Sequence, residues 1–248
     1  MKNPADVMPA ATARLFTQLD AEPLLDSFTL IGGTALALHI GHRKSEDLDY
    51  ITLLPKLPRA ALLALTQKLE KSGHTVIQND RPESFDDFDI AGMDLKDHSQ
   101  SFLIGGEVKT TFFTADSHDA KIFGSNPAAA ENKGPGPGLA TLEQLSQLKA
   151  IVVAGRSKSR DWLDLYFLEK NHGFGLAQWR QAYLKAGLTD SHLETALNRI
   201  CSGVVAVDDE GFDTLLPNPP TVKEISNHFK ALREQYELNL AQQKLKER

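Results

Sequence analysis

The spacing of apolar and polar residues gives the two halves of this chain different characters. In the first half, short β-branched or apolar runs predict strands at residues 28–31, 47–53 and 75–78, with further strand-like pieces between residues 85 and 113. Apolar residues at helical spacing predict helices over residues 34–40 and 59–71 and a short helix within residues 7–25. We therefore expect a mixed α+β layer in this half.

The second half begins after a change of composition. Residues 124–138 are dominated by Asn, Pro, Ala and Gly, which cannot pack a core, so they predict a loop or linker. Beyond them the periodicity is helical, and three candidate capping boxes pair Thr141 with Gln144, Ser191 with Glu194 and Thr221 with Glu224. The predicted organisation is an α+β core over residues 1–123, a loop or linker over 124–140 and an all-helical half over 141–248.

Composition excludes several classes of protein. The 248 residues are 41% hydrophobic and 24% charged, which are globular values, and they contain no apolar run long enough to span a membrane. The first residues make a poor signal peptide, and the single cysteine, Cys201, cannot form an internal disulfide, so we expect a cytoplasmic protein. A net charge of −6 does not suggest a protein that coats nucleic acid, although a local basic patch could still bind RNA.

Two carboxylates and a diglycine carry the candidate chemistry. Asp47 and Asp49 are one residue apart on a predicted strand, so they share a face and repel each other unless a cation lies between them, and Mg²⁺ is the usual ion. Gly32 and Gly33 join a predicted strand to a predicted helix, where backbone amides attract phosphate. Either feature alone is common in ordinary surface strands and tight turns. Together they favour phosphoryl or nucleotidyl transfer.

The same residues carry a resemblance to a known family. Residues 30–36 (LIGGTAL) and 41–49 (GHRKSEDLD) closely resemble the AbiEii/AbiGii nucleotidyltransferase toxins of the DNA-polymerase-β-like superfamily. A second block, made of Lys149, the Gly155–Arg156 step and residues 160–168 (RDWLDLYFL), matches the same family in the same order. The resemblance implies a polymerase-β-like sheet followed by helices that close a nucleotide cleft.

The resemblance also implies roles for individual residues. Gly32, Gly33 and Thr34 would cradle the phosphates of a nucleoside triphosphate, with the Thr34 hydroxyl as an extra donor. Asp47 and Asp49 would hold two Mg²⁺ ions, with Mn²⁺ as an alternative.

The other candidates are basic residues and one further acid. Arg43, Lys149, Arg156 and Arg160 would bind nucleotide phosphates, and Lys149 would also be catalytic. Asp161 would take part in catalysis too. The charges on residues 160–168 have a second interpretation as ordinary surface ion pairs of a helix.

One position departs from the superfamily pattern. Members commonly carry a third acid on a later strand, and at the corresponding place this sequence has Thr111. Either Glu107 or a C-terminal acid such as Asp161 replaces it as the base, or catalysis is weak.

Three functions stay open at this point. The first is an enzyme that transfers a nucleoside monophosphate to the 3′ end of a tRNA or to a protein hydroxyl, as the toxin of a toxin–antitoxin or abortive-infection system with a separately encoded antitoxin. The second is a degenerate module that binds nucleotide or RNA without turnover. The third is a small-molecule nucleotidyltransferase of the aminoglycoside-modifying type. We expect no membrane partner.

Overall fold

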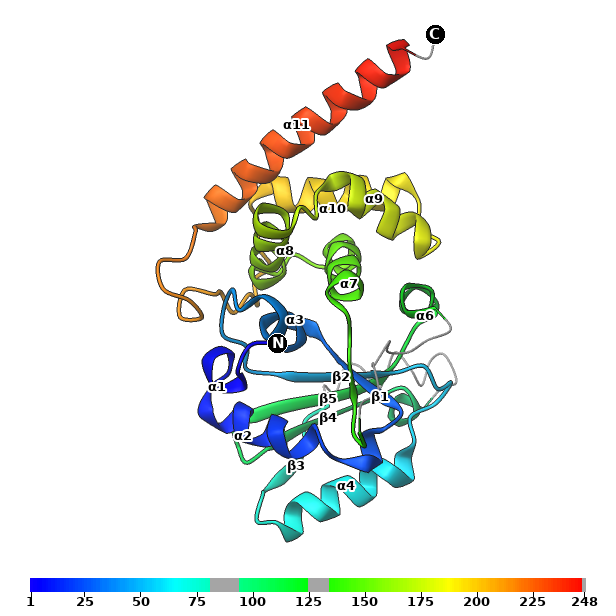
Figure 1. Ribbon diagram of the computed structural model, residues 1–248, viewed down its shortest axis with the longest axis vertical. Coiled ribbons are helices and arrows are strands. Elements are labelled where there is room, and N and C mark those ends of the chain that lie inside the picture. Colours follow the sequence, from blue (N-terminus) through cyan, green and yellow to red (C-terminus); the bar gives the residue numbers. More distant parts are fainter. Residues whose placement is uncertain (81–93, 125–133, 247–248) are drawn as a thin grey trace. The chain divides into compact units, whose positions relative to one another are not determined.

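The computed structural model describes residues 1–80, 94–124 and 134–246, which divide into two compact units, residues 1–142 and 143–248. Each unit is described by itself (Figure 1). Among the described residues, no helix is long and apolar enough to cross a membrane. The strand-like piece expected between residue 85 and Gly92 lies outside the described residues.

The first unit is built on one mixed sheet of six strands. The strands are β1 (Phe28–Ile31), β2 (Leu48–Thr52), β3 (Val76–Gln78), β4 (Ser99–Ile104), β5 (Val108–Thr114) and β6 (Gly138–Leu139). They lie in the order β3-β4-β5-β2-β1-β6, with β2 parallel to β5, β6 parallel to β1, and the other neighbours antiparallel.

Helices surround this sheet. They are α1 (Pro4–Val7), α2 (Ala10–Leu19), α3 (Gly32–Ile40), α4 (Arg59–Lys71) and α6 (Ser117–Phe123), with 3₁₀ turns at Pro23–Leu25 and Leu95–Asp97. In Figure 1, α2 and α4 lie on the same side of the sheet, and they contact β5 and β3, respectively. The predicted bounds of β1 and α4 are confirmed. The short helix expected within residues 7–25 is confirmed as α2, which begins after Pro9, and Pro23 starts a separate 3₁₀ turn.

An aromatic cluster defines the buried face of the sheet. The rings of Tyr50 on β2 and Phe112 on β5 stack with centroids 5.3 Å apart, and Phe28 and Phe102 meet Phe112 edge-on. Because side chains alternate along a strand, the neighbours of Tyr50 and Phe112 project from the opposite face. That opposite face carries Asp49.

The second unit is all-helical. Its helices are α7 (Leu142–Gly155), α8 (Ser159–His172), α9 (Leu176–Lys185), α10 (Asp190–Ser202) and α11 (Val222–Lys246). Trp162 and Trp179 are fully buried in its core, and the indole of Trp179 packs on Phe229 of α11. The expected fold class, a mixed sheet followed by an all-helical half, is confirmed.

The helix caps agree with the sequence in one case and differ in another. Thr221 and Glu224 form the predicted reciprocal capping pair at the start of α11. The box predicted for Ser191 and Glu194 is wrong, because Ser191 is already inside α10. Thr189 caps that helix together with His192. The usual capping box has Glu or Gln at the third helical position, so the pattern does not predict a histidine there.

The segment 124–140, expected as a loop or linker, contributes to the sheet at its end. Gly138 and Leu139 form β6, which pairs with Thr29 and Leu30 of β1. The next residue is also fixed to this unit: the amide of Ala140 donates to the Leu30 carbonyl at 3.1 Å, and the Ala140 carbonyl lies 2.8 Å from Nε2 of His39 on α3.

Candidate active site

The turn between β1 and α3 is packed against a carboxylate. Gly32 has a φ of +74°, and a Cβ built on it would lie 2.7 Å from Oδ2 of Asp49. A side chain at this position would therefore be strained by the backbone and would also strike the carboxylate. The register explains the approach, since Ile31, which precedes the glycine, pairs directly with Asp49. Glycine here lets the Asp49 carboxylate lie directly against the first residue of α3.

The second glycine is packed against a buried arginine. A Cβ on Gly33 would clash with the Arg43 guanidinium and would lie 3.1 Å from Oγ of Ser45. Arg43 is only 6% exposed and donates from Nη1 to the Lys44 carbonyl at 2.9 Å. Arg43, predicted as a nucleotide-binding residue, is thus buried against Gly33 in the turn between β1 and α3.

Thr34 joins the turn to the start of β2. Its hydroxyl donates to the Asp47 carbonyl and lies 2.9 Å from Oγ of Ser45, and the side chain is 1% exposed. The loop is held at a second point, where the Ser45 amide donates to the Val7 carbonyl at 2.9 Å. The Thr34 hydroxyl therefore fixes the position of the Asp47 backbone through a hydrogen bond.

The two aspartates do not both lie on the strand. Asp49 is the second residue of β2, and Asp47 ends the loop that precedes it. Both side chains are half-buried. The hydrogen bond from the Thr34 hydroxyl, and not the ladder of a strand, holds the backbone of Asp47.

This donor set fits a divalent cation. Asp49, whose carboxylate lies against Gly32, and Asp47 two residues before it provide oxygen ligands of the kind that Mg²⁺ or Mn²⁺ prefers. No group of three or more His, Cys, Asp or Glu residues suited to a metal occurs within the described residues. Asp47 and Asp49 are the residues that would hold the metal which the family resemblance implies.

The strand beside Asp49 carries threonine. β2 and β5 are parallel, and Asp49 pairs directly with Thr111. Glu107, one of the two acids considered as a replacement, is exposed and lies in the β4–β5 turn before β5 begins. It is four residues from Thr111, about 13 Å along an extended strand. Glu107 is thus too distant to serve Asp49 as its strand neighbour.

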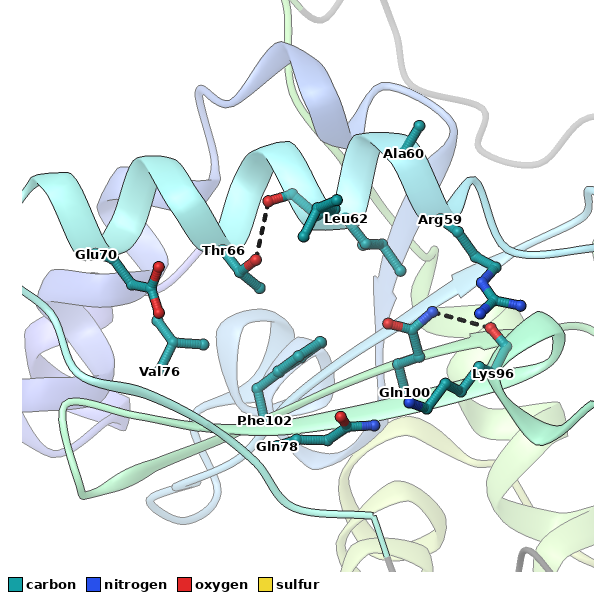
Figure 2. A pocket seen from close by; sticks show the side chains of 11 residues that line it. Arg59, Ala60, Leu62, Thr66, Glu70, Val76, Gln78, Lys96, Gln100 and Phe102 are labelled. Atoms are coloured by element: carbon teal, nitrogen blue, oxygen red, sulfur yellow. Dashed lines mark hydrogen bonds between the residues drawn. The ribbon is translucent and has the colours of Figure 1, made fainter.

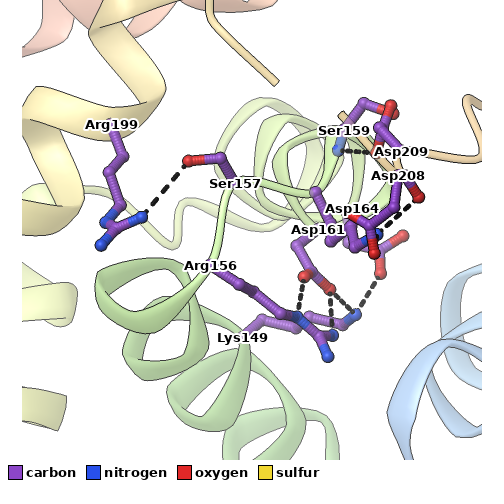
Figure 3. Close-up of polar contacts among 10 residues, drawn as sticks. Lys149, Arg156, Ser157, Ser159, Asp161, Asp164, Arg199, Asp208 and Asp209 are labelled. Carbon is purple, nitrogen blue, oxygen red and sulfur yellow. Dashed lines mark hydrogen bonds and ion pairs between the residues drawn. The ribbon is translucent and has the colours of Figure 1, made fainter. Parts of the chain in front are cut away.

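The second block of sequence motifs forms a buried ionic cluster in the helical unit (Figure 3). Nζ of Lys149 on α7 lies 2.6 Å from Asp161 and 2.8 Å from Asp164, both on α8. Arg156 adds a bidentate contact to Asp161 through Nε at 2.7 Å and Nη2 at 3.2 Å. Asp164 is fully buried and Asp161 is 2% exposed, so these are not the solvated ion pairs of a surface helix.

The cluster sets the ionisation of Asp161. Burial by itself raises the pKa of this carboxyl, but the Lys149 ammonium and the Arg156 guanidinium outweigh it and hold the pKa below its ordinary value. Asp161 is therefore a carboxylate at neutral pH. Its low basicity suits a residue that orients Lys149 better than one that accepts a proton.

The start of α8 binds an acidic loop that the sequence motifs did not reveal. Arg160 donates from Nε to the Gly211 carbonyl at 2.8 Å and pairs with Glu210 at 3.0 Å. Asp209 accepts from the Ser159 amide at 2.9 Å, and Lys158 pairs with Asp208 at 2.8 Å. The signal was a run of three acids at residues 208–210, opposite in charge to Lys158 and Arg160.

A hollow of about 450 Å³ lies elsewhere in the first unit, between α4 and the outer strands β3 and β4 (Figure 2). Phe102 lines it, and the same ring meets Phe112 on the buried face of the sheet. The hollow is therefore on the opposite face from Asp49 and takes no part in the candidate site.

A sheet that carries paired carboxylates beside a glycine turn at a helix start is the arrangement of enzymes that transfer nucleotidyl or phosphoryl groups. Comparison with known proteins names the family. Residues 14–243 match the model of the nucleotidyl transferase AbiEii toxin of type IV toxin–antitoxin systems, and the chain belongs to that family. The resemblance found in the sequence is thus confirmed.

Individual relatives are distant. An uncharacterized protein of Aquifex aeolicus (strain VF5), aq_aa25, is 23% identical over 86% of this chain and 89% of its own length. Among solved structures, MenT4, a nucleotidyltransferase toxin of Mycobacterium tuberculosis, is 12% identical with a TM-score of 0.48 and covers 88% of this chain and 79% of its own. JHP933 of Helicobacter pylori is 18% identical with a TM-score of 0.40 and covers 94% and 97%.

Proposed function

We propose that this member of the toxin family transfers a nucleoside monophosphate from a nucleoside triphosphate to an acceptor hydroxyl, in a metal-dependent reaction. The close approach of Gly32 to the Asp49 carboxylate supports the proposal, because the start of a helix attracts phosphate and a carboxylate beside it suits a divalent ion.

In this reaction the acceptor oxygen attacks the α-phosphorus and forms a new P–O bond. The bond from the α-phosphorus to the bridging oxygen breaks, and pyrophosphate leaves with the electron pair. The proton of the acceptor hydroxyl passes to solvent or to a carboxylate of the site. Bound Mg²⁺ would neutralise phosphate charge.

The chain's own residues hold the substrate. The amides of Gly33 and Thr34 would bind the β- and γ-phosphates, Arg43 keeps the turn rigid, and Asp47 and Asp49 would hold the divalent ion. Binding of the triphosphate or the acceptor by Lys149, Arg156 and Arg160 of the helical unit stays a prediction from the family resemblance.

The test is transfer of label. Purified protein is incubated with each of the four α-³²P nucleoside triphosphates, Mg²⁺ and total bacterial tRNA, then with protein alone and with an aminoglycoside as acceptor. Asp49→Asn keeps the shape of the site and removes its charge, whereas Asp94→Asn, which changes an exposed aspartate paired with Arg59, is the matched control. We expect transfer by the wild type and by Asp94→Asn, and a loss of at least 100-fold in Asp49→Asn.

The labelled acceptor names the substrate class. The toxin role has its own test: induced expression of the wild type would arrest bacterial growth, and expression of Asp49→Asn would not. Release of arrest by a gene next to the toxin gene would identify the separately encoded antitoxin.

One observation favours a second candidate, a module that binds nucleotide without turnover. Thr111 occupies the position beside Asp49 from which a strand carboxylate would act. Metal-dependent binding of nucleotide with no label transfer to any of the three acceptors would support that module and refute the enzyme.

A further inference from the structure

A lysine shares the face of the sheet that carries the candidate site. Along β5, Val108, Thr110 and Phe112 are buried with the aromatic cluster, whereas Lys109 and Thr111 are half-buried and project from the other face. Sequence motifs gave no reason to single out Lys109. It stands two residues from the threonine that replaces the expected acid.

The strand register places this lysine next to the paired carboxylates. Thr111 pairs with Asp49, so Lys109, one pleat earlier on the parallel strand, stands beside the position of Asp47. Neighbouring strands are about 4.8 Å apart, and diagonal neighbours on one face are within reach of long side chains. The ammonium, on a flexible four-carbon stem, can therefore reach the space over both carboxylates.

Lys109 also differs from the other candidate cations in having no partner. Its backbone belongs to the β4–β5 ladder, but within the part of the chain that the structure describes its side chain makes no hydrogen bond or ion pair. Lys149, Arg156 and Arg160 are each paired with an acid of the helical unit. An unpaired, half-buried cation on the site face is available to an anionic ligand.

We propose that Lys109 supplies, beside Asp47 and Asp49, the positive charge that a second metal ion would otherwise provide, so that the site binds a single divalent ion with the nucleotide. The inference rests on the proposed function. With threonine in place of a third acid, the site has two negative charges and one fixed positive charge, which neutralises phosphate but repels a second cation. The ammonium contacts the α-phosphate, on the side of Asp49 away from the glycine turn.

The experiment counts metal ions. Equilibrium dialysis with Mn²⁺, checked by electron paramagnetic resonance, measures bound ions per chain in the presence of saturating α,β-methylene analogues of ATP, GTP, CTP and UTP. The ions held by the free analogue are measured in parallel. The wild type is expected to bind one Mn²⁺ per nucleotide at the site, and Asp49→Asn to bind none there.

Two variants test the lysine itself. Lys109→Glu creates the missing acid and is expected to bind two Mn²⁺ per nucleotide. Lys109→Met is expected to keep one ion but to bind the analogue at least tenfold more weakly, because a charge-assisted contact is lost. Lys71→Met, at the exposed end of α4, is the control and is expected to behave as the wild type. Circular dichroism and the unfolding midpoint confirm that each variant is folded.

The outcomes separate the two proposals. Two Mn²⁺ in the wild type would overturn the role of Lys109 and leave the transferase proposal standing. Absence of any metal-dependent nucleotide binding in the wild type would overturn both. An unchanged affinity in Lys109→Met, with one ion still bound, would show that the lysine does not touch the phosphate and would also overturn the inference.

Discussion

Removing the ammonium of Lys149 should destabilise the helical unit by several kcal/mol. In Lys149→Met the stem is retained, but the carboxylates of Asp161 and Asp164 lose the cation between them. Both touch the same nitrogen, at 2.6 and 2.8 Å, so their two acceptor oxygens are at most about 5.4 Å apart. At that distance two unit charges repel by about 3 kcal/mol for an effective dielectric constant near 20. Loss of one partner from a buried ion pair typically costs about 3–5 kcal/mol, which agrees with this Coulomb energy.

The assay uses a property of this chain. Its two tryptophans, Trp162 and Trp179, are both buried in the helical unit, so tryptophan fluorescence in urea follows the unfolding of that unit alone. Lys149→Met should lower the free energy of unfolding by about 3 kcal/mol or more at pH 7. Arg180→Met, which breaks the exposed pair with Asp190, should leave the unfolding midpoint unchanged within error.

A double variant distinguishes repulsion from lost packing. Lys149→Met with Asp164→Asn removes one of the two carboxylate charges, so it should be more stable than Lys149→Met alone by about 2–3 kcal/mol. A double variant as unstable as the single one would refute the electrostatic reasoning. A loss below about 1 kcal/mol in Lys149→Met would mean that the cluster is not effectively buried.

Three other expectations follow from the structure. Gly32→Ala should abolish metal-dependent nucleotide binding, measured by calorimetric titration, because its Cβ would meet Asp49, and should also destabilise the first unit by about 1–3 kcal/mol, because its φ is positive. Thr221→Ala removes the cap of α11 and should speed amide exchange in its first turn about fivefold, as followed by mass spectrometry. The lowered pKa of Asp161 stabilises the fold at neutral pH, and this contribution is lost as pH falls through that lowered pKa, below the ordinary aspartate value near 4. Acid titration followed by tryptophan fluorescence should show this loss of stability in the wild type. The same loss should be absent in Asp161→Asn.

Local patterns predicted the elements near the site well. The β-branched run before Gly32 gave β1, and the leucine spacing gave α4, because both signals are local. The glycine turn and the two aspartates were also found from sequence. The pairing of Asp49 with Thr111 was not, because it depends on a parallel register between strands almost sixty residues apart, which no local pattern encodes.

The cluster around Lys149 shows the same limit. Arg160, Asp161 and Asp164 at helical spacing are compatible with a solvated face, and only the packing of α7 on α8 decides that Asp161 and Asp164 are buried and share one ammonium. Arg43 was predicted to bind nucleotide, yet its burial under Gly33 could not be read from a polar loop. Burial of charge is a property of the assembled fold.

Helix α3 makes a contact at each end that matters for the candidate site. Its first residue, Gly32, faces the Asp49 carboxylate, and His39, near its last turn, holds the Ala140 carbonyl two residues before α7 begins. Nine helical residues span only about 13 Å and do not stretch. We predict that a ligand that shifts the glycine turn also moves Ala140, and a nucleotide-dependent change in the amide resonance of Ala140 would register that movement.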